Sequence, residues 1–346
     1  MVFEGSGLLT ATVFLPLAGA LLIAIIRPSD QRVRILAGIV AVVELALSIL
    51  VFKLFDITTS GIQLVDKITN WIPFGSSNIQ YHLGVDGLSA PLVLLTGILG
   101  MVAIFASWKI KVRVKEYFIW LLILQTAVMG AFVALDFILF FLLWELEMIP
   151  MFFLISIWGS GRKEYSAMKF LIFTFLGSAF MLVGILALFF STNTFDMTRL
   201  PDAIHGAELI IPGSLIFALL FTAFAVKLPI WPVHSWLPDA HTDAPTAVSV
   251  MLAGVLLKMG GYGIIRISTG MFPEIIVNAA WAIAVLGVIN VLYGALVTLR
   301  QTDLKRLIAF SSISHMGFVL LGVSSVAGAA GTVSIVGLTG ASMQMF

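Results

Sequence analysis

The sequence predicts an all-α membrane protein, a polytopic bundle of transmembrane helices, and three observations carry this prediction. Hydrophobic residues make up 60% of the 346 residues. Charged residues make up 11%, whereas soluble domains usually carry about 25%. Apolar stretches of about 20 residues, the length of a helix that crosses a bilayer core of roughly 30 Å, follow one another along the whole chain. A water-soluble globular fold is therefore excluded.

We expect ten transmembrane helices and part of an eleventh, because the sequence contains that many separate apolar stretches. The predicted helices span 7–26, 35–55, 87–107, 117–135, 137–157, 167–190, 213–236, 245–267, 275–299, 306–326 and 331–346. The linkers between them are too short to hold a soluble domain, so 1–346 is interpreted as a single membrane domain. The final stretch is too short to cross a bilayer together with its flank, which indicates a truncated sequence.

The stretches differ in how many charges interrupt them. Those at 7–26, 87–107, 117–135 and 275–299 contain no charged residue, so a membrane helix is the direct prediction. Five of the remaining stretches carry ionisable residues in their interior, and these residues are the candidates for function discussed below. No Lys or Arg precedes the first stretch, which argues against a secretory leader and favours a retained helix.

The linkers alternate in charge, and this alternation predicts the orientation because Lys and Arg accumulate in cytoplasmic loops. The basic linkers and their flanks contain Arg27, Arg32, Arg34, Lys109, Lys111, Arg113, Lys115, Arg162, Lys163, Lys169, Arg300, Lys305 and Arg306. The segments 56–86 and 191–212, in contrast, are acidic and hold one basic residue each. We therefore expect the N-terminus on the outside of the membrane.

Charge balance and composition exclude several classes of function. The 19 Lys and Arg and the 18 Asp and Glu leave a net charge of +1, so the chain has no basic surface for nucleic acid. It contains no cysteine, which excludes disulfides, Cys-ligated clusters and thiol catalysis. The histidines lack metal-ligand spacing, and no nucleotide-binding glycine motif is present. We expect no metal and no cofactor bound by this chain.

Six ionisable residues lie inside predicted membrane helices, where each charge costs at least about 2.5–3.5 kcal/mol and therefore suggests a function. They are Glu44, Glu145, Glu147, Lys227, Lys258 and His315. The alternative for each is a purely structural, satisfied polar contact. That alternative applies most to Glu44, which stands alone among Ala, Val and Leu. It also applies to Glu147, which lies about 200° around the helix from Glu145 and cannot face the same cavity.

Three prolines follow Lys227 and predict a broken membrane helix: Pro229, Pro232 and Pro238. Backbone groups freed by such a break must be satisfied by protein or water, so the break should line a hydrated cavity. Broken helices commonly form ion sites in transporters. The carbonyl end of the first half-helix favours a protonated Lys227 and burial favours the neutral amine, a balance suited to a proton carrier. A proline kink used only for packing is the alternative.

Five long motifs are distinctive, and they lie at 84–89, 144–151, 229–246, 252–263 and 303–317. Together they resemble the antiporter-like subunits of proton-pumping NADH:quinone oxidoreductase, respiratory complex I. The resemblance covers the whole chain. The Trp-Glu-Leu-Glu-Met-Ile-Pro-Met motif is most similar to the M-type subunit, chain 4.

This resemblance implies an antiporter-like fold of about fourteen helices with inverted repeats and broken helices, of which about eleven would be present. Helices one to three would occupy 7–107, the first repeat 117–267 and an incomplete second repeat 275–346.

The resemblance also implies roles for single residues. Glu145 corresponds to the carboxylate that pairs with the broken-helix lysine, Lys227. Lys258 corresponds to the central lysine of the proton relay and His315 to the histidine that continues it. His241 corresponds to a histidine near the cytoplasmic entrance.

The implied function is that of a translocase subunit: protons cross the membrane through this chain while electron transfer takes place in other subunits. NADH, flavin, Fe–S clusters and quinone would be bound by those partners, and the neighbours would be other membrane-arm subunits in a bacterial inner membrane or an equivalent energy-transducing membrane. Glu44 and Glu147 are candidates for the entrance or for support of the relay. A subunit of a multisubunit cation/proton antiporter or of a membrane-bound hydrogenase is the alternative function.

Overall fold

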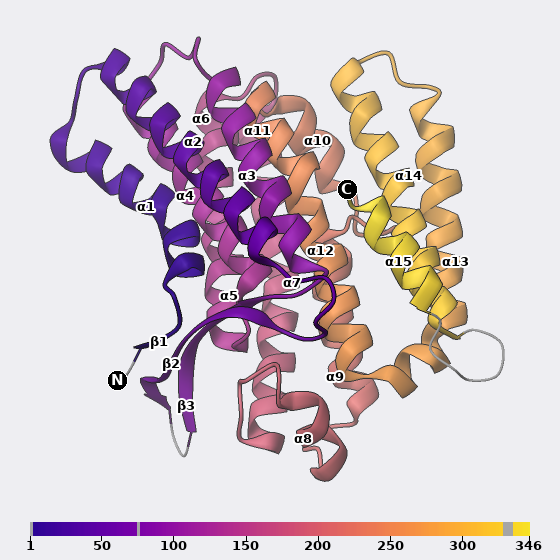
Figure 1. Ribbon diagram of the computed structural model, residues 1–346. Coiled ribbons are helices and arrows are strands. Elements are labelled where there is room, and N and C mark those ends of the chain that lie inside the picture. The colour runs from indigo at the N-terminus through magenta and orange to yellow at the C-terminus, as the bar shows by residue number, and fades with distance from the viewer. Residues whose placement is uncertain (1–2, 75–76, 328–334) are drawn as a thin grey trace. The chain divides into compact units, whose positions relative to one another are not determined.

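The computed structural model describes residues 3–74, 77–327 and 335–346 (Figure 1). Within these residues, nine helices are long and apolar enough to cross a membrane. The predicted class, a polytopic transmembrane helix bundle, is therefore confirmed. The predicted helix at 213–236 is present as a shorter apolar helix, α9 (Gly213–Lys227), and part of the predicted stretch at 331–346 lies outside the described residues.

The chain divides into two compact units, each described by itself. The first comprises Met1–Ala167, Phe195–Met197 and Ala244–Val255, and the second comprises Met168–Thr194, Thr198–Asp243 and Leu256–Phe346.

In the first unit, the helices surround a central, mostly buried helix, α4. They are α1 (Leu8–Ile26), α2 (Asp30–Leu54), α3 (Ser89–Ala106), α4 (Val114–Val133), α5 (Phe137–Leu146), α6 (Met148–Trp158) and the short α11 (Thr246–Met251). α4 packs against α1, α2, α3, α5 and α6. A helix enclosed in this way has no solvent-facing side, which explains why its sequence carries no charged residue after the first turn; Gln125 and Thr126 are its buried polar residues there.

The predicted helix at 137–157 is present as one candidate membrane span, Phe137–Trp158, which is broken at a single residue, Glu147. α5 ends at Leu146 and α6 begins at Met148. Pro150 explains the interruption, because it has no N–H to donate to Leu146 and its ring collides with the carbonyl of that residue.

The acidic segment 56–86 was expected to be a linker, and it forms a β-hairpin instead. Its strands are β2 (Gln63–Phe74) and β3 (Ser77–Val85), and the two-residue strand β1 (Phe3–Glu4) pairs with β2 to complete an antiparallel sheet. β2 and β3 are rich in β-branched and aromatic residues, which fit a pleated surface. The all-α prediction thus holds for the membrane helices but did not include this sheet. The sheet lies at one end of the first unit's helices (Figure 1).

The ends of the first unit differ in charge. At one end the basic linkers contact one another: Arg34 donates to the carbonyl of Ile110 at 2.8 Å, and the Trp158 indole donates to that of Val112 at 2.6 Å. At the other end, the sheet holds the start of α1 through the buried carboxylate of Asp66. This carboxylate accepts the backbone N–H of Gly7 at 2.8 Å and of Thr10 at 2.9 Å.

In the second unit, regular helices alternate with irregular turns. The helices are α7 (Lys163–Thr192, which begins in the first unit), α8 (Leu200–Gly206), α9, α10 (Trp236–Asp243), α12 (Leu257–Gly263), α13 (Pro273–Thr298), α14 (Leu304–Ser324) and α15 (Ile335–Gln344). α14 packs between α13 and α15 (Figure 1).

Glycines bring α13 and α14 close together. A Cβ atom on Gly294 would lie 2.6 Å from the backbone nitrogen of Ser314 and 3.0 Å from the carbonyl oxygen of Phe310. Small residues at such a crossing let two membrane helices approach to backbone contact, which replaces the hydrophobic driving force that is absent in lipid.

We expect Gly294→Ala to lower the free energy of unfolding by about 1–3 kcal/mol, because the methyl group meets backbone that has no rotamer with which to yield. Gly270→Ala is the matched control, since a Cβ there would meet nothing within 4 Å. Thermal unfolding of the detergent-solubilised full-length protein measures both. Equal melting temperatures for the two variants would contradict this packing.

Candidate functional site

The predicted helix at 213–236 is interrupted directly after Lys227, the last residue of α9. The chain then follows an irregular path until α10 begins at Trp236. Pro229 and Pro232 lie in this irregular path. Pro238 lies in the first turn of α10, a position where a missing N–H costs nothing.

The backbone of the interruption is satisfied by two side chains of the second unit. Asn290 accepts from the N–H of Trp231 at 2.7 Å and donates to the carbonyl of Pro229 at 3.3 Å. The Trp236 indole donates to the carbonyl of Val226 at 2.9 Å. Protein groups thus replace the water that a broken helix would otherwise require.

Asn290 and Tyr293 were not singled out in the sequence, and both lie on α13. His234, inside the interruption, has its Nε2 atom 3.2 Å from the Tyr293 hydroxyl oxygen. Residues three apart share one helix face, so α13 directs two polar side chains toward the interruption. The signal that could have revealed them is this spacing of two polar side chains within an uncharged membrane stretch.

The structure brings Lys227 and Lys258 onto two helices whose backbones touch. A Cβ atom on Gly260 would lie 2.5 Å from the nitrogen of Leu228 and 2.8 Å from the carbonyl oxygen of Phe224. Lys227 is buried and Lys258 is half-buried. Two lysines therefore flank a contact that only a glycine permits.

The helix around Lys258 departs from regular α-geometry on both sides. α12 is preceded by the π-helical segment Leu252–Leu256 and followed by another, Ile264–Thr269. Such wide turns are rare and concentrate at functional sites. The helix geometry is therefore irregular on both sides of the α12 turn that carries Lys258.

His315 lies on an exposed face of α14. Its Nδ1 atom is 3.3 Å from the side-chain nitrogen of Gln344 in α15, which is its hydrogen-bond partner among the described residues.

Cationic residues from two helices, α7 and α14, converge on α10. Asp239 has one carboxylate oxygen 2.8 Å from the Lys169 ammonium of α7 and the other 3.7 Å from the Arg306 guanidinium of α14. Lys305 also reaches α10, with its ammonium 3.4 Å from the carbonyl oxygen of Thr242. These contacts hold α10 against the ends of two membrane helices.

His241 lies in α10, outside the membrane spans, and is buried. Burial first, and then the positive charge of Lys305, lower the pKa of His241 to about 4. The imidazole is therefore neutral at physiological pH.

The three carboxylates predicted to lie inside membrane helices, those of Glu44, Glu145 and Glu147, belong to the first unit. Glu145 is half-buried in the last turn of α5, and Glu147 is fully buried at the interruption between α5 and α6. The expected angle of about 200° between Glu145 and Glu147 applies to a continuous helix. Here Glu145 lies in α5 and Glu147 lies between α5 and α6, so that angle does not describe their positions. Glu44 is fully buried in α2.

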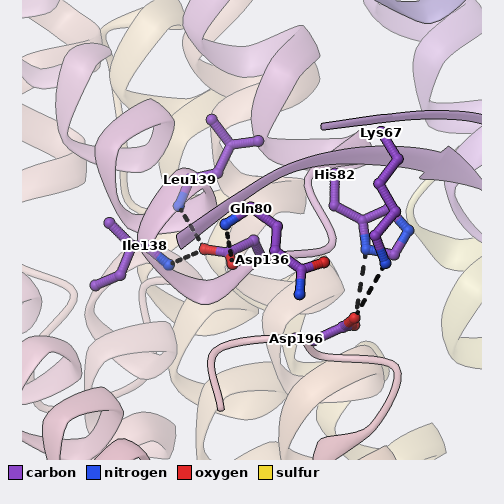
Figure 2. Close-up of polar contacts among 7 residues, drawn as sticks. All are labelled: Lys67, Gln80, His82, Asp136, Ile138, Leu139 and Asp196. Atoms are coloured by element: carbon purple, nitrogen blue, oxygen red, sulfur yellow. Dashed lines mark hydrogen bonds and ion pairs between the residues drawn. The ribbon is translucent and has the colours of Figure 1, made fainter. Parts of the chain in front are cut away.

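A second polar cluster of the first unit joins the hairpin to the segment 195–197 (Figure 2). The buried Asp196 has its carboxylate 3.4 Å from the Lys67 ammonium and 3.7 Å from Nδ1 of His82. Lys67 comes from β2 and His82 from β3, so one carboxylate ties together both strands and a distant loop.

Asp136 lies beside this cluster and caps α5 (Figure 2). Its carboxylate accepts the backbone N–H of Gln80 at 3.0 Å, of Ile138 at 2.9 Å and of Leu139 at 3.3 Å. Burial raises the pKa of Asp136 to about 6, although these three hydrogen bonds lower it. The negative charge of Asp196 also raises this pKa. Sequence reasoning placed Asp196 in an acidic linker and did not single out Asp136, because nothing in the sequence places 80, 136 and 196 together.

The described residues contain no group of three or more His, Cys, Asp or Glu arranged to hold a metal ion.

Known families match nearly the whole chain. The family model described as "NADH:quinone oxidoreductase/Mrp antiporter, TM" matches residues 134–344, and the model for the amino terminus of NADH-ubiquinone oxidoreductase chain 4 matches residues 34–131. The chain belongs to the NADH:quinone oxidoreductase/Mrp antiporter family. The family resemblance inferred from the motifs is thereby confirmed.

Among its relatives, NAD(P)H-quinone oxidoreductase chain 4 of Thermosynechococcus vestitus is 42% identical over 339 residues, which are 97% of this chain and 62% of the relative. A chain 4 of Synechococcus elongatus is 45% identical over 341 residues, with the same shares of 97% and 62%. This chain thus spans 62% of the length of these two relatives.

The fold is similar to solved membrane complexes. A chain of respiratory complex I from Thermus thermophilus has a TM-score of 0.79 at 24% identity, over 97% of this chain and 69% of that one. A chain of an archaeal membrane-bound sulfane sulfur reductase also has a TM-score of 0.79, at 22% identity, over 92% of this chain and 65% of that one.

The raised pKa of Asp136 predicts a pH-dependent stability. The folded state binds this proton more tightly than the unfolded state, so the stabilisation is complete below about pH 4 and is lost as the pH rises through about 6. We expect the melting temperature of the full-length protein to fall across this interval relative to that of Asp136→Asn, by an amount equivalent to on the order of 2–3 kcal/mol.

Asp56→Asn is the control, because Asp56 is exposed and hydrogen bonds from Thr58 and Thr59 lower its pKa. Its substitution should leave the stability profile between about pH 5 and 7 unchanged. If Asp136→Asn kept the wild-type profile in that range, the assignment of this titration to Asp136 would be wrong.

Proposed function

We propose that this chain is a proton-translocating membrane subunit, of the chain 4 type, in an NADH:quinone oxidoreductase. The observation that carries the proposal is the interruption after Lys227, where a buried lysine ends a half-helix and a second lysine, Lys258, follows on a helix in backbone contact with it. Interrupted helices with an ionisable group at their ends are the usual ion sites of transporters.

Lys227 and Lys258 pass protons to one another in this proposal. Each lysine is placed where the protonated and neutral forms are close in free energy, since burial opposes the charge and helix carbonyls favour it. The π-helical turns beside Lys258 give its backbone room to shift and to admit water. His315 is the proposed next member of the relay, and its exposed ring on α14 has room for a further donor or acceptor.

Glu145 is the proposed switch of the relay. An opposite charge within about 4–6 Å changes a proton affinity by a factor of about 10 to 1000. A carboxylate close to Lys227 therefore holds its proton, and withdrawal of the carboxylate releases it. Glu147, buried at the interruption of α5, is assigned a supporting role.

His241 is the proposed entrance to the relay. It is neutral, and Asp239 with its two cationic partners anchors the short helix that carries it. This part of the chain joins basic residues of α7 and α14, as is expected of the cytoplasmic side. The basic linkers that meet at one end of the first unit support the same orientation, with the N-terminus outside.

Electron transfer is assigned to partner subunits, which would bind NADH, flavin, Fe–S clusters and quinone. The proposed neighbours are the other membrane-arm subunits, in a bacterial inner membrane or an equivalent energy-transducing membrane. The match of residues 34–131 to the amino terminus of chain 4 favours the oxidoreductase over a cation/proton antiporter or a hydrogenase. The assignment of 117–267 and 275–346 to inverted repeats belongs to this proposal.

We expect Glu145→Ala and Lys227→Ala, introduced into the full-length subunit, to abolish proton pumping coupled to quinone reduction while the complex still assembles. Each removes one partner of the proposed switch. Proton uptake by inverted membrane vesicles, measured together with NADH oxidation, reports the coupling. Glu147→Gln is the comparison and should reduce pumping much less than Glu145→Gln. Unchanged proton stoichiometry in both alanine variants would refute the switch.

Lys258→Arg tests whether Lys258 carries protons or only provides charge. Arginine keeps the positive charge and does not release its proton at accessible pH, so we expect pumping to be lost although the local charge is preserved. The same vesicle assay measures this. Pumping at the wild-type rate would show that Lys258 acts only through its charge.

A further inference from the structure

Glu44 is the buried acid that the proposed relay does not use. It lies about 20 Å along α2, a helix about 37 Å long, and so falls near the middle of the membrane. Its side chain is fully buried, and neither carboxylate oxygen has a hydrogen-bond partner among the described residues. An ionised carboxylate cannot be held in such a position without compensation.

No cation faces Glu44 from the helices packed against α2, which are α1, α3 and α4. Neither α1 nor α3 contains Asp, Glu, Lys, Arg, His or Tyr. The ionisable residues of α4 all lie in its first turn, and those of α2 other than Glu44 lie in its first two turns and its last. They are Lys115, Glu116 and Tyr117 in α4, and Asp30, Arg32, Arg34 and Lys53 in α2.

Glycine contacts establish the register of α2 against α3. A Cβ on Gly38 would lie 3.6 Å from the Trp108 ring, and a Cβ on Gly97 would lie 2.6 Å from the hydroxyl oxygen of Ser48. The numbers rise along one helix as they fall along the other, so the helices are antiparallel. Glu44 is one turn before Ser48 on the same face of α2, and it is therefore level with residues 100 and 101 of α3.

Gln125 of α4 occupies the same level. Its amide lies directly against Gly100, where a Cβ atom would overlap it. Gln125 is fully buried, and neither its amide oxygen nor its amide nitrogen has a hydrogen-bond partner among the described residues. Two unsatisfied polar side chains thus share one level of the α2–α4 bundle, beside a glycine that leaves space for the Gln125 amide.

We propose that Glu44 and Gln125 form a hydrated proton-binding site in the first unit, separate from the lysine relay. A carboxylic acid and a carboxamide are complementary: the acid O–H donates to the amide oxygen, and the amide N–H donates to the acid carbonyl. One water can bridge any remaining gap, because buried polar groups nearly always find a partner in protein or in ordered water. The water relays a proton from the solvent to the carboxylate and is itself left neutral, and the neutral acid needs no cation.

Gly100 has a defined role in this site. Any side chain there would displace the Gln125 amide, so the glycine keeps the space that acid, amide and water share. The site does not depend on the proposed lysine relay, since it requires only that the acid be protonated and reachable by water.

Infrared difference spectroscopy of the assembled complex, in H2O and in D2O, tests the proposal. The wild type should show a carbonyl band of a protonated carboxyl group that moves to lower frequency in D2O, because the acid proton exchanges with water. Glu44→Gln should lose this band. Gln125→Leu should keep it at a higher frequency, because the acid carbonyl no longer accepts a hydrogen bond from the amide.

Two further variants make the result decisive. Glu116→Gln removes an exposed carboxylate paired with Arg113 and should leave the band unchanged. The double variant Glu44→Gln with Gln125→Glu exchanges acid and amide, and it should assemble and keep an exchanging band even if the single Glu44 variant does not assemble. Each of three results would overturn the proposal. The carbonyl band could persist in Glu44→Gln, it could keep its wild-type frequency in Gln125→Leu, or it could be absent from the double variant.

Discussion

The need to satisfy every backbone polar group away from water governs this structure. Most of the chain meets it with regular helices, whose hydrogen bonds are internal. After Lys227 the prolines make that solution impossible, and the second unit supplies Asn290 and the Trp236 indole in its place. The charged end of a half-helix is thereby held inside protein.

Glycine is the second device, because it decides how closely the helices approach. Gly260 permits the backbone contact that brings Lys227 and Lys258 onto touching helices, and Gly294 does the same for α13 and α14. Gly100 leaves space in which the Gln125 amide lies. In lipid, close packing replaces the hydrophobic effect as the cause of helix association. The glycines therefore stabilise the helix packing and also leave space for polar side chains.

Buried charge is handled differently at the ends of the first unit and in its interior. At the sheet end, the charge of Asp196 is compensated by Lys67, and three backbone N–H groups donate to Asp136. In the middle of α2, Glu44 has no comparable partner among the described residues, and a neutral acid is the consistent form. Protonation thus takes the place of pairing where no cation is within reach.

The sequence by itself determined the membrane class, most helix positions and the interruption after Lys227, because hydropathy, charge and proline chemistry act locally along the chain. It did not reveal the hairpin at 63–85, whose pairing depends on the strands meeting. Nor did it reveal the roles of Asn290 or Asp136, since their partners are distant in sequence. Only the tertiary structure decided which side chains satisfy the broken backbone, because that choice depends on how closely neighbouring helices pack.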